Sequence, residues 1–291
     1  MPQTTLRNKS EFKLHFSKRI LDLSSRAHLM GILNVTPDSF SDGGKFLRTE
    51  DAVRRGIKMA EEGADIIDVG GESTRPGSDP VTIEEELSRV IPVIEALSQK
   101  IDIPISIDTY KSEVAKKALD AGAEMINDIS ALRFDPQMKK IADEYQVPIV
   151  LMHIKGTPKN MQENPYYDDV ITEITEYLKQ SIEIAQKAGI GREKIIIDPG
   201  IGFGKRLEDN LNILKNLKKF SILDCPILVG PSKKSFIGKI LDLPVEERLE
   251  GSLAALAVSI MNGANIIRVH DVKESKRVAT LVDAILGSRT V

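Results

Sequence analysis

The chain repeats one pattern of hydrophobic and polar positions, in which a helical stretch is followed by a short buried strand. Three segments show it most clearly, at residues 62–68, 121–127 and 262–268. In each, a glycine follows an amphipathic stretch, an apolar pair comes next, and a polar residue ends the run. A glycine just past a helix accommodates the left-handed backbone conformation that ends many helices. The repeat therefore predicts helix–turn–strand units.

A second set of apolar runs contains a proline near its start, at residues 103–105, 147–149 and 225–227. Proline is tolerated at the first residue of a strand because it need not donate to the ladder there. Residues 28–34 and 194–198 complete a set of eight predicted strands. Helical patterns separate these strands, and strands that alternate with helices predict a parallel sheet.

Eight strand–helix units in a chain of about this length fit a closed α/β barrel, a (β/α)8 TIM barrel, and an open doubly wound sheet is the alternative. Residues 12–16 and 19–23 alternate between apolar and polar, which predicts a β-hairpin that we place across the bottom of the barrel. We expect a single domain overall, with residues 1–28 as an N-terminal extension and hairpin and residues 29–291 as the barrel.

Two local patterns predict individual helices. Thr82 and Glu85 have the spacing of a capping box at a helix start. Further along, apolar residues recur at the spacing of a helix's buried face. These residues are Val170, Ile174, Leu178, Ile182 and Ala185.

Composition and charge exclude several classes of protein. Of 291 residues, 41% are hydrophobic and 29% charged, and the formal net charge is −3. A nucleic-acid-binding protein usually has a strong basic excess, so we expect no nucleic-acid partner. No apolar run is long enough to span a bilayer and residues 1–10 lack the core of a secretory signal, so we expect no membrane association and a cytoplasmic location. The single cysteine, Cys225, is expected to be a buried thiol.

Polar residues or glycine-rich turns follow the carboxyl end of every predicted strand, where barrel enzymes build their active sites. In chain order they are Asn34, Asp68, Asp108, Asn127 with Asp128, Met152 with His153, Asp198, Gly230, and the group Arg268, His270 and Asp271. The loops after the first two strands are long and rich in Gly, Ser, Asp and Pro, a composition typical of mobile lids.

Three of these residues, Asp108, Asn127 and Asp198, are rich in hydrogen-bond acceptors and are expected to converge inside the barrel. Carboxylates and an amide suit the N–H edge of a heterocycle such as a guanidine-like aminopyrimidinone. His153 is interpreted as a wall residue and is left out of the predicted site.

Lys234, Arg268 and His270 are cationic or potentially cationic and lie on or after the last two strands, where barrels often bind phosphate. A helix starting near Ser232 would add backbone N–H groups that favour an anion. Together these positions predict a site for a flat polar heterocycle and an anionic leaving group, covered by closing loops.

Two long motifs then resemble a known family. The segment GILNVTPDSFSDGG at residues 31–44 and the segment GGESTRPG at residues 70–77 are similar to the first and second signatures of dihydropteroate synthases. Further motifs follow in the family order, at residues 107–109, 126–128, 198–205, 232–236 and 268–271. The match runs from about Leu29 to the C-terminus, and such long ordered motifs are more specific than a lone glycine pattern.

The resemblance implies a transferase that joins 6-hydroxymethyl-7,8-dihydropterin pyrophosphate to p-aminobenzoate and releases pyrophosphate, with Mg2+ as cofactor and a homodimer as the assembly. It implies pterin contacts from Asp108, Asn127, Asp198 and Lys234. It implies pyrophosphate contacts from Asn34, Arg268 and His270, with Asn34 also at the metal. It implies p-aminobenzoate contacts from Thr74, Arg75, Pro76, Phe203 and Ser235. Residues 253–261 are apolar enough to offer a dimer surface.

A dissociative reaction fits these groups, with Asp108, Lys234 and Arg268 as the expected catalytic residues. If the C–O bond breaks first, Asp108 would stabilise the pterin cation, and Arg268 with Mg2+ would stabilise the departing charge. Loop closure would keep water from the cation. The family often has Arg where Lys233 stands, which keeps the charge but not a bidentate contact.

Three other functions compete with this interpretation. A dinuclear metallohydrolase would need a His-x-His pair on the first strand, where Asn34 stands. A pterin-dependent methyltransferase of the same barrel superfamily would share the acceptor pocket, although the Ser-Thr-Arg-Pro loop favours the synthase. A non-catalytic pterin-binding paralogue should have lost its pyrophosphate ligands, yet Asn34, Arg268 and His270 are present.

Overall fold

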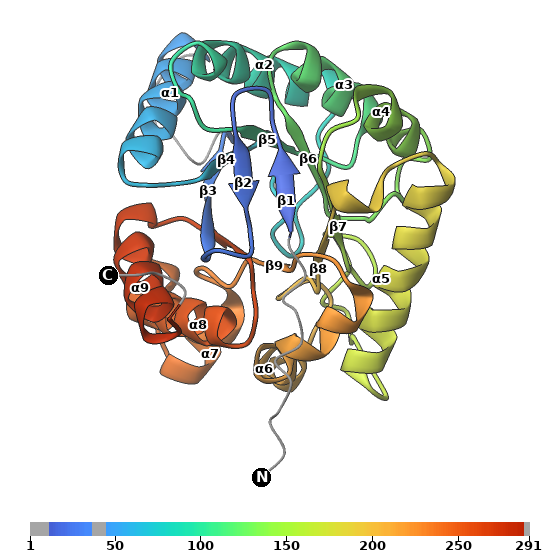
Figure 1. Cartoon of the computed structure of the whole chain (residues 1–291), viewed down its shortest axis with the longest axis vertical. Coiled ribbons are helices and arrows are strands. Elements are labelled where there is room, and N and C mark those ends of the chain that lie inside the picture. Colours follow the sequence, from blue (N-terminus) through green and yellow to red (C-terminus); the bar gives the residue numbers. More distant parts are fainter. Residues whose placement is uncertain (1–11, 37–44, 288–291) are drawn as a thin grey trace.

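Eight parallel strands surrounded by helices make up most of the computed structural model, which describes residues 12–36 and 45–287 (Figure 1). The strands of this sheet are β3 (His28–Asn34), β4 (Ile66–Gly70), β5 (Ile105–Asp108), β6 (Met125–Asp128), β7 (Ile149–Met152), β8 (Ile195–Asp198), β9 (Leu228–Val229) and β10 (Ile266–Val269). Their order is β8-β7-β6-β5-β4-β3-β10-β9.

Helices connect consecutive strands and cover the outside of the sheet. The α-helices are α1 (Lys45–Glu61), α2 (Ile83–Ser98), α3 (Ser112–Asp120), α4 (Met138–Tyr145), α5 (Val170–Lys187), α6 (Leu207–Lys215), α7 (Ser235–Leu241), α8 (Leu249–Met261) and α9 (Val272–Ile285). Short 3-10 helices are η2 (Arg192–Lys194), η3 (Leu217–Leu223) and η4 (Val245–Glu247). In the part of the chain that the structure describes, no helix is both long and apolar enough to cross a bilayer.

The two edge strands meet and complete the barrel. Ile197 of β8 bridges Ile227 in parallel, and the N–H of Ile197 donates to the carbonyl of Pro226 at 3.0 Å. Both edges of the sheet are therefore paired, so the predicted (β/α)8 barrel is confirmed and the open doubly wound sheet is wrong.

The predicted helix–turn–strand units are confirmed at each repeat. Gly63, Gly122 and Gly263 have φ angles of 100°, 110° and 99°, in the left-handed region that glycine adopts without strain. The predicted buried face of α5 is also correct, since Val170, Ile174, Leu178, Ile182 and Ala185 are all buried. Cys225 is buried as expected, and burial raises the pKa of its thiol to about 11.

One helix start is built only partly as predicted. Thr82 caps α2, and its hydroxyl accepts a hydrogen bond from the N–H of Glu85 at 3.2 Å. The Glu85 carboxylate bonds to Arg89 one turn further along the helix. The half-buried arginine competes for the carboxylate that a reciprocal capping box would use.

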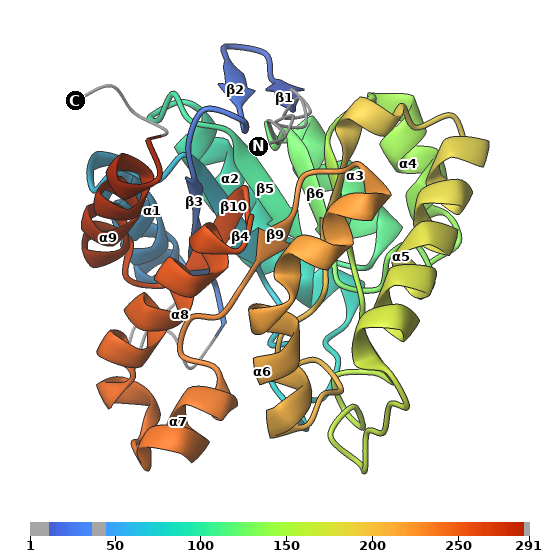
Figure 2. The same cartoon turned by 60° about the horizontal axis from the view of Figure 1, so that its bottom comes forward.

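The predicted hairpin is present and closes the end of the barrel where the strands begin. Strands β1 (Lys13–His15) and β2 (Ile20–Asp22) pair antiparallel, and they lie across the ring of helices in Figure 1 and above it in Figure 2. Leu14 and Leu21 pack into a buried cluster with residues near the start of the barrel strands. These residues are Met30, Ile66, Met125, Val150, Ile196, Leu228 and Ile266. The hairpin is therefore a plug for the apolar interior of the barrel.

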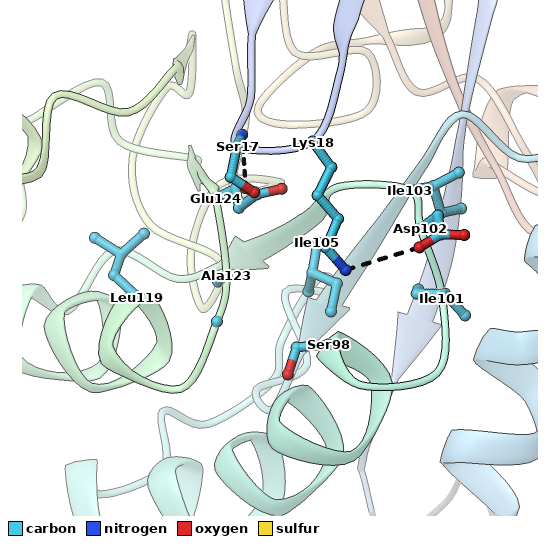
Figure 3. Close-up of a pocket in the computed structure, with 11 residues that line it drawn as sticks. Ser17, Lys18, Ser98, Ile101, Asp102, Ile103, Ile105, Leu119, Ala123 and Glu124 are labelled. Carbon is cyan, nitrogen blue, oxygen red and sulfur yellow. Dashed lines mark hydrogen bonds and ion pairs between the residues drawn. The ribbon is translucent and has the colours of Figure 1, made fainter.

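A hollow of about 350 Å³ lies beside the turn of this hairpin (Figure 3). Ser17 donates its N–H to Glu124 at 2.9 Å on one side, and Lys18 lies 3.7 Å from Asp102 on the other. Barrel enzymes work at the opposite end, so this hollow is part of the hairpin's seat and not the expected catalytic site.

Removal of the plug should destabilise the protein. Leu14→Ala is expected to lower the free energy of unfolding by about 3 kcal/mol, because it empties a fully buried position. Urea unfolding followed by circular dichroism measures this change. Ile20→Ala is the matched control on the same hairpin, since Ile20 is 57% exposed and its loss should cost less than about 0.5 kcal/mol. Equal effects of the two substitutions would contradict the plug.

Candidate active site

A buried ion-pair cluster lies at the carboxyl ends of the strands. Arg268 of β10 donates from Nε to Oδ2 of Asp68 on β4 at 2.6 Å, and from Nη2 to Oδ2 of Asp108 on β5 at 2.6 Å. Asn127 on β6 donates from Nδ2 to the same Asp68 oxygen at 3.0 Å. Four strands therefore converge on a single cluster, as the acceptor pattern predicted for Asp108 and Asn127.

Asp68 was missing from the predicted site, although it was recognised as a strand-end residue. It is fully buried and contacts both Arg268 and Asn127, so it is the centre of the cluster. Its position at the end of β4 gave a signal, but its contact with an arginine 200 residues away in the sequence could not be predicted from local pattern.

Burial sets the protonation of the two other carboxylates predicted here. The pKa of Asp108 is raised to about 7, because burial favours the neutral acid more strongly than Arg268 favours the carboxylate. The pKa of Asp198, at the end of β8, is raised to about 6 by burial. The N–H of Gly200 at 2.7 Å and the cation of Lys234 limit that rise.

Lys234, the residue before α7, is a charged neighbour of both Asp108 and Asp198. Its Nζ lies 4.1 Å from the centroid of the Phe203 ring, a cation–π distance. Burial, with the nearby charge of Arg268, lowers the pKa of Lys234 to about 8. The structure therefore brings Phe203, Lys234 and Asp198 to one side of the pocket.

His270 was predicted as potentially cationic, and this is wrong near neutral pH. Burial and then the charge of Arg268 lower its pKa to about 3, so the imidazole is neutral. Its Nδ1 lies 3.0 Å from the hydroxyl of Ser232. Arg55 donates to the His270 carbonyl at 2.9 Å and fixes the chain at this point. His270 can donate a hydrogen bond to an anion, but its neutral ring adds no positive charge.

The helix after β9 begins later than predicted. α7 starts at Ser235 and not near Ser232, because Lys233 has a φ of 57° and interrupts the helical backbone. The ammonium of Lys233 forms an ion pair with Asp271 at 3.0 Å, so this cation already has a carboxylate partner. Ser235 is exposed at the first position of the helix.

The loop after β4 contains the other predicted residues, Thr74, Arg75 and Pro76. Ser78 closes this loop, since its hydroxyl donates to the carbonyl of Arg75 at 2.8 Å and its N–H donates to the same oxygen at 3.1 Å. Arg75 and Pro76 are exposed and Thr74 is half-buried. The structure thus places these three at the rim and does not bring them into contact with the buried cluster.

A second ionic network anchors the base of this loop, and sequence reasoning missed it. The ammonium of Lys111 contacts Glu72 at 2.5 Å, Glu86 at 2.7 Å and the carbonyl of Val81 at 2.7 Å. Tyr110 donates to Glu72 at 2.7 Å. The loop therefore leaves the barrel from a fixed point. The other predicted mobile loop, at residues 37–44, lies outside the described residues.

Asn34 ends β3 and lies close to Gly70 of β4 and Asp108 of β5. A Cβ on Gly70 would lie 3.7 Å from Oδ1 of Asn34 and 3.5 Å from Oδ2 of Asp108. Oxygen donors suit Mg2+, which usually keeps few protein ligands and takes the rest from water and substrate phosphates. The described residues contain no cluster of three or more His, Cys, Asp or Glu that would hold a metal by itself. The side-chain oxygen of Asn34 is of the donor type that Mg2+ accepts.

The Arg268 bridge, by which we mean its ion pairs with Asp68 and Asp108, should contribute more to the free energy of unfolding at high pH than at low pH. Arg268→Met leaves Asp68 and Asp108 without their shared cation, and we expect a loss of about 3 kcal/mol in the free energy of unfolding at pH 8. The folded-state pKa of Asp108 lies above its unfolded value, so protonation of this group in the folded state adds stability that is lost as pH rises through about 7. The loss should therefore be smaller at pH 5.

Urea unfolding of both proteins at pH 5 and pH 8 measures this difference. Lys159→Met is the control, since it removes an exposed cation paired with Asp79 and should change stability little at either pH. A loss from Arg268→Met that is the same at both pH values would show that the carboxylates do not depend on the bridge.

The chain is similar to a family of known enzymes. Residues 30–270 match the model of the family described as pterin binding enzyme. The chain is 50% identical to the dihydropteroate synthase of Escherichia coli strain K12 over 277 residues, which is 95% of this chain and 98% of that protein. It is 47% identical to that of Synechocystis over 273 residues, or 94% of each.

Solved structures agree as well. The Yersinia pestis dihydropteroate synthase in a sulfonamide drug complex has a TM-score of 0.90 and 45% identity, covering 94% of this chain and 99% of that one. The Xanthomonas albilineans dihydropteroate synthase with 4-aminobenzoic acid has a TM-score of 0.89 and 45% identity, covering 95% and 98%. The fold, the buried strand-end cluster and these relatives together show that the chain belongs to the dihydropteroate synthase family of pterin-binding enzymes.

Proposed function

We propose that the protein catalyses the condensation of 6-hydroxymethyl-7,8-dihydropterin pyrophosphate with p-aminobenzoate to 7,8-dihydropteroate and pyrophosphate, a step of folate biosynthesis. The observation that carries this proposal is the strand-end cluster in which Asp108 and Asn127 meet Arg268. Relatives at about half identity over nearly the whole chain support it. So does a Xanthomonas albilineans relative whose structure is described in complex with 7,8-dihydropteroate, at 43% identity.

The pterin is proposed to bind to Asp108, Asn127, Asp198 and Lys234. A pterin presents an aminopyrimidinone edge rich in N–H donors, and buried carboxylates and amide oxygens are its natural acceptors. The pKa of Asp198 is about 6, so it is an acceptor-only carboxylate at neutral pH. Lys234, a charged neighbour of Asp198, would supply a donor to the ring carbonyl or nitrogen.

The pyrophosphate is proposed to bind to Asn34, Arg268 and His270. Arg268 offers a planar set of donors, and neutral His270 offers one more. Asn34 would hold Mg2+ with the substrate phosphates, and the bound ion would neutralise charge on the leaving group.

The p-aminobenzoate is proposed to bind between the loop that contains Thr74, Arg75 and Pro76 and the side formed by Phe203 and Ser235. Phe203 offers an aromatic face at the edge of the pterin pocket, beside Lys234. Ser235 exposes the hydroxyl and N–H of the first residue of α7, which suit a carboxylate. Arg75 adds a positive charge at the rim.

We propose a dissociative reaction in which the bond from the pterin methylene carbon to oxygen breaks and its electron pair leaves with the pyrophosphate. Asp108 stabilises the pterin cation, and Arg268 stabilises the pyrophosphate. The amine nitrogen of p-aminobenzoate then bonds to the methylene carbon and loses a proton. Because the cluster is buried, water is kept from the cation while the amine approaches.

A dimer is proposed from an apolar surface on α8 and α9. Val258 and Met261 on α8, and Leu281 and Ile285 on α9, are exposed large hydrophobic residues on two helices that pack together. Such a surface suits a second copy of this chain. Sedimentation equilibrium tests this, and a monomer at micromolar concentration would contradict it. We also propose a cytoplasmic location, in keeping with the single buried thiol.

The function is tested by incubating the protein with the dihydropterin pyrophosphate, p-aminobenzoate and Mg2+. Dihydropteroate and pyrophosphate should form in equal amounts, and omission of either substrate or chelation of the metal should abolish both. Asp108→Asn should reduce turnover by about 100-fold, because it removes the charge that stabilises the cation. Pterin binding without turnover would favour the non-catalytic paralogue, and methyl transfer from a methylated pterin would favour the methyltransferase.

A further inference from the structure

Lys205 is a buried cation that the proposed reaction does not use. It precedes α6 in the loop after β8, and only 3% of its surface is exposed. Among the described residues, no carboxylate lies within ion-pair distance of its ammonium. A lysine is almost never buried in this way without a specific set of partners.

Its partners are three acceptors on two loops. Nζ of Lys205 lies 2.9 Å from the carbonyl of Phe203, 3.3 Å from the carbonyl of His153 and 2.9 Å from Nδ1 of the same histidine. The three acceptors match the three protons of an ammonium group, whereas a neutral amine has only two. Burial lowers the pKa of His153 well below its usual value, so its ring is neutral and can accept. Burial lowers the pKa of the Lys205 ammonium well below its ordinary value, and the three acceptors oppose this effect by holding the protonated form.

These contacts hold Phe203 in place. Gly202 and Gly204, on either side of it, have φ angles of 85° and 65°, so the backbone here is a tight left-handed turn. Tyr167 donates a hydrogen bond to the carbonyl of Gly204 at 2.7 Å, and Lys205 donates one to the carbonyl of Phe203. The Phe203 ring is thereby fixed against Lys234 at the edge of the pocket.

The same ammonium lies behind Asp198. A Cβ built on Gly200 would be 3.2 Å from Nζ of Lys205, and the N–H of Gly200 donates to Asp198 at 2.7 Å. Gly200 therefore lies between the ammonium of Lys205 and the carboxylate of Asp198. The charged groups that face Asp198 are Lys234, Lys205 and Arg268. Those that face Lys205 are Asp198, Lys234, Asp209 and Lys155.

We propose that Lys205 is a positioning residue of this active site: its ammonium fixes the backbone of Phe203 for p-aminobenzoate and places a positive charge behind Asp198 for the pterin. This inference rests on the proposed function and extends it to a residue that touches neither substrate. Loss of Lys205 should therefore affect the two substrates through two different physical effects.

Two variants separate these effects. Lys205→Met removes the charge and the donors, whereas Lys205→Gln removes the charge and keeps two N–H donors. Lys205→Met should raise the KM for p-aminobenzoate by about fivefold, the net value of one hydrogen bond, with a smaller change in kcat. Lys205→Gln should bring that KM back to within about twofold of the wild type.

The pterin effect is measured as the dissociation constant of 6-hydroxymethylpterin, followed by fluorescence from pH 5 to pH 9. Asp198 must be ionised to accept from the pterin, so affinity falls as pH falls through its pKa of about 6. We call the fall in pterin affinity on the acid side the acid limb. Without the Lys205 cation, the midpoint of the acid limb should rise by about one pH unit in both variants. The ligand and Asp108 also titrate in this range, and these titrations should be the same in the wild type and the variants. Asp108 faces a different set of charged groups, namely Arg268, Asp68, Glu86 and Lys234.

Tyr167→Phe is the matched control, because it removes one hydrogen bond to the same turn without removing a cation. It should raise the KM for p-aminobenzoate but leave the acid limb unmoved. An acid limb that is the same in Lys205→Met and the wild type, or that moves equally in Tyr167→Phe, would overturn the proposal.

Folding is checked by thermal melting. If Lys205→Met does not fold, Lys205→Gln still provides the pH measurement, and failure of both to fold would assign Lys205 to the core and overturn the proposal. A wild-type protein that binds the pterin but forms no dihydropteroate would instead refute the proposed function.

Discussion

The guanidinium of Arg268 is shared between two buried carboxylates, and the architecture of the site depends on this arrangement. Asp68 and Asp108 come from adjacent strands, and each would repel the other if the arginine were removed. Arg268 reaches both because β10 pairs with β3, which in turn pairs with β4. A buried arginine between two carboxylates is favourable only when the hydrogen bonds are complete, and here Asn127 supplies a further donor to Asp68. The closed barrel and the charged cluster therefore depend on each other.

The same arrangement prepares the site for an exchange of partners. In the structure, Arg268 is occupied by carboxylates, whereas the proposed reaction needs it on the pyrophosphate. Binding of an anion would draw the guanidinium away from Asp108 and leave that carboxylate free for the pterin and its developing cation. Asp68 is fully buried and holds Nε of Arg268, so it can keep the side chain in place during the exchange. Lys234 and Asp198, with pKa values of about 8 and about 6, form a second set of neighbouring opposite charges at neutral pH.

Much of the fold could be predicted from the sequence because its signals are local. The glycines at 63, 122 and 263 mark helix ends, and the alternation in residues 12–16 and 19–23 marks the hairpin. The site was harder, because the strand ends show which residues face the mouth but not which of them meet. Asp68 was therefore undervalued, since its importance comes from Arg268 at the far end of the chain. The neutrality of His270 and the unpaired burial of Lys205 depend on desolvation, which no sequence pattern records.

The most direct test of the shared arginine is a calorimetric titration of the wild type and Asp108→Asn with pyrophosphate, in the absence of Mg2+. If Asp108 competes with the anion for Arg268, the variant should bind pyrophosphate about tenfold more tightly, because the guanidinium is released and one negative charge is gone. Equal or weaker binding by the variant would contradict the account, since it would mean that Asp108 does not hold Arg268 away from the leaving group.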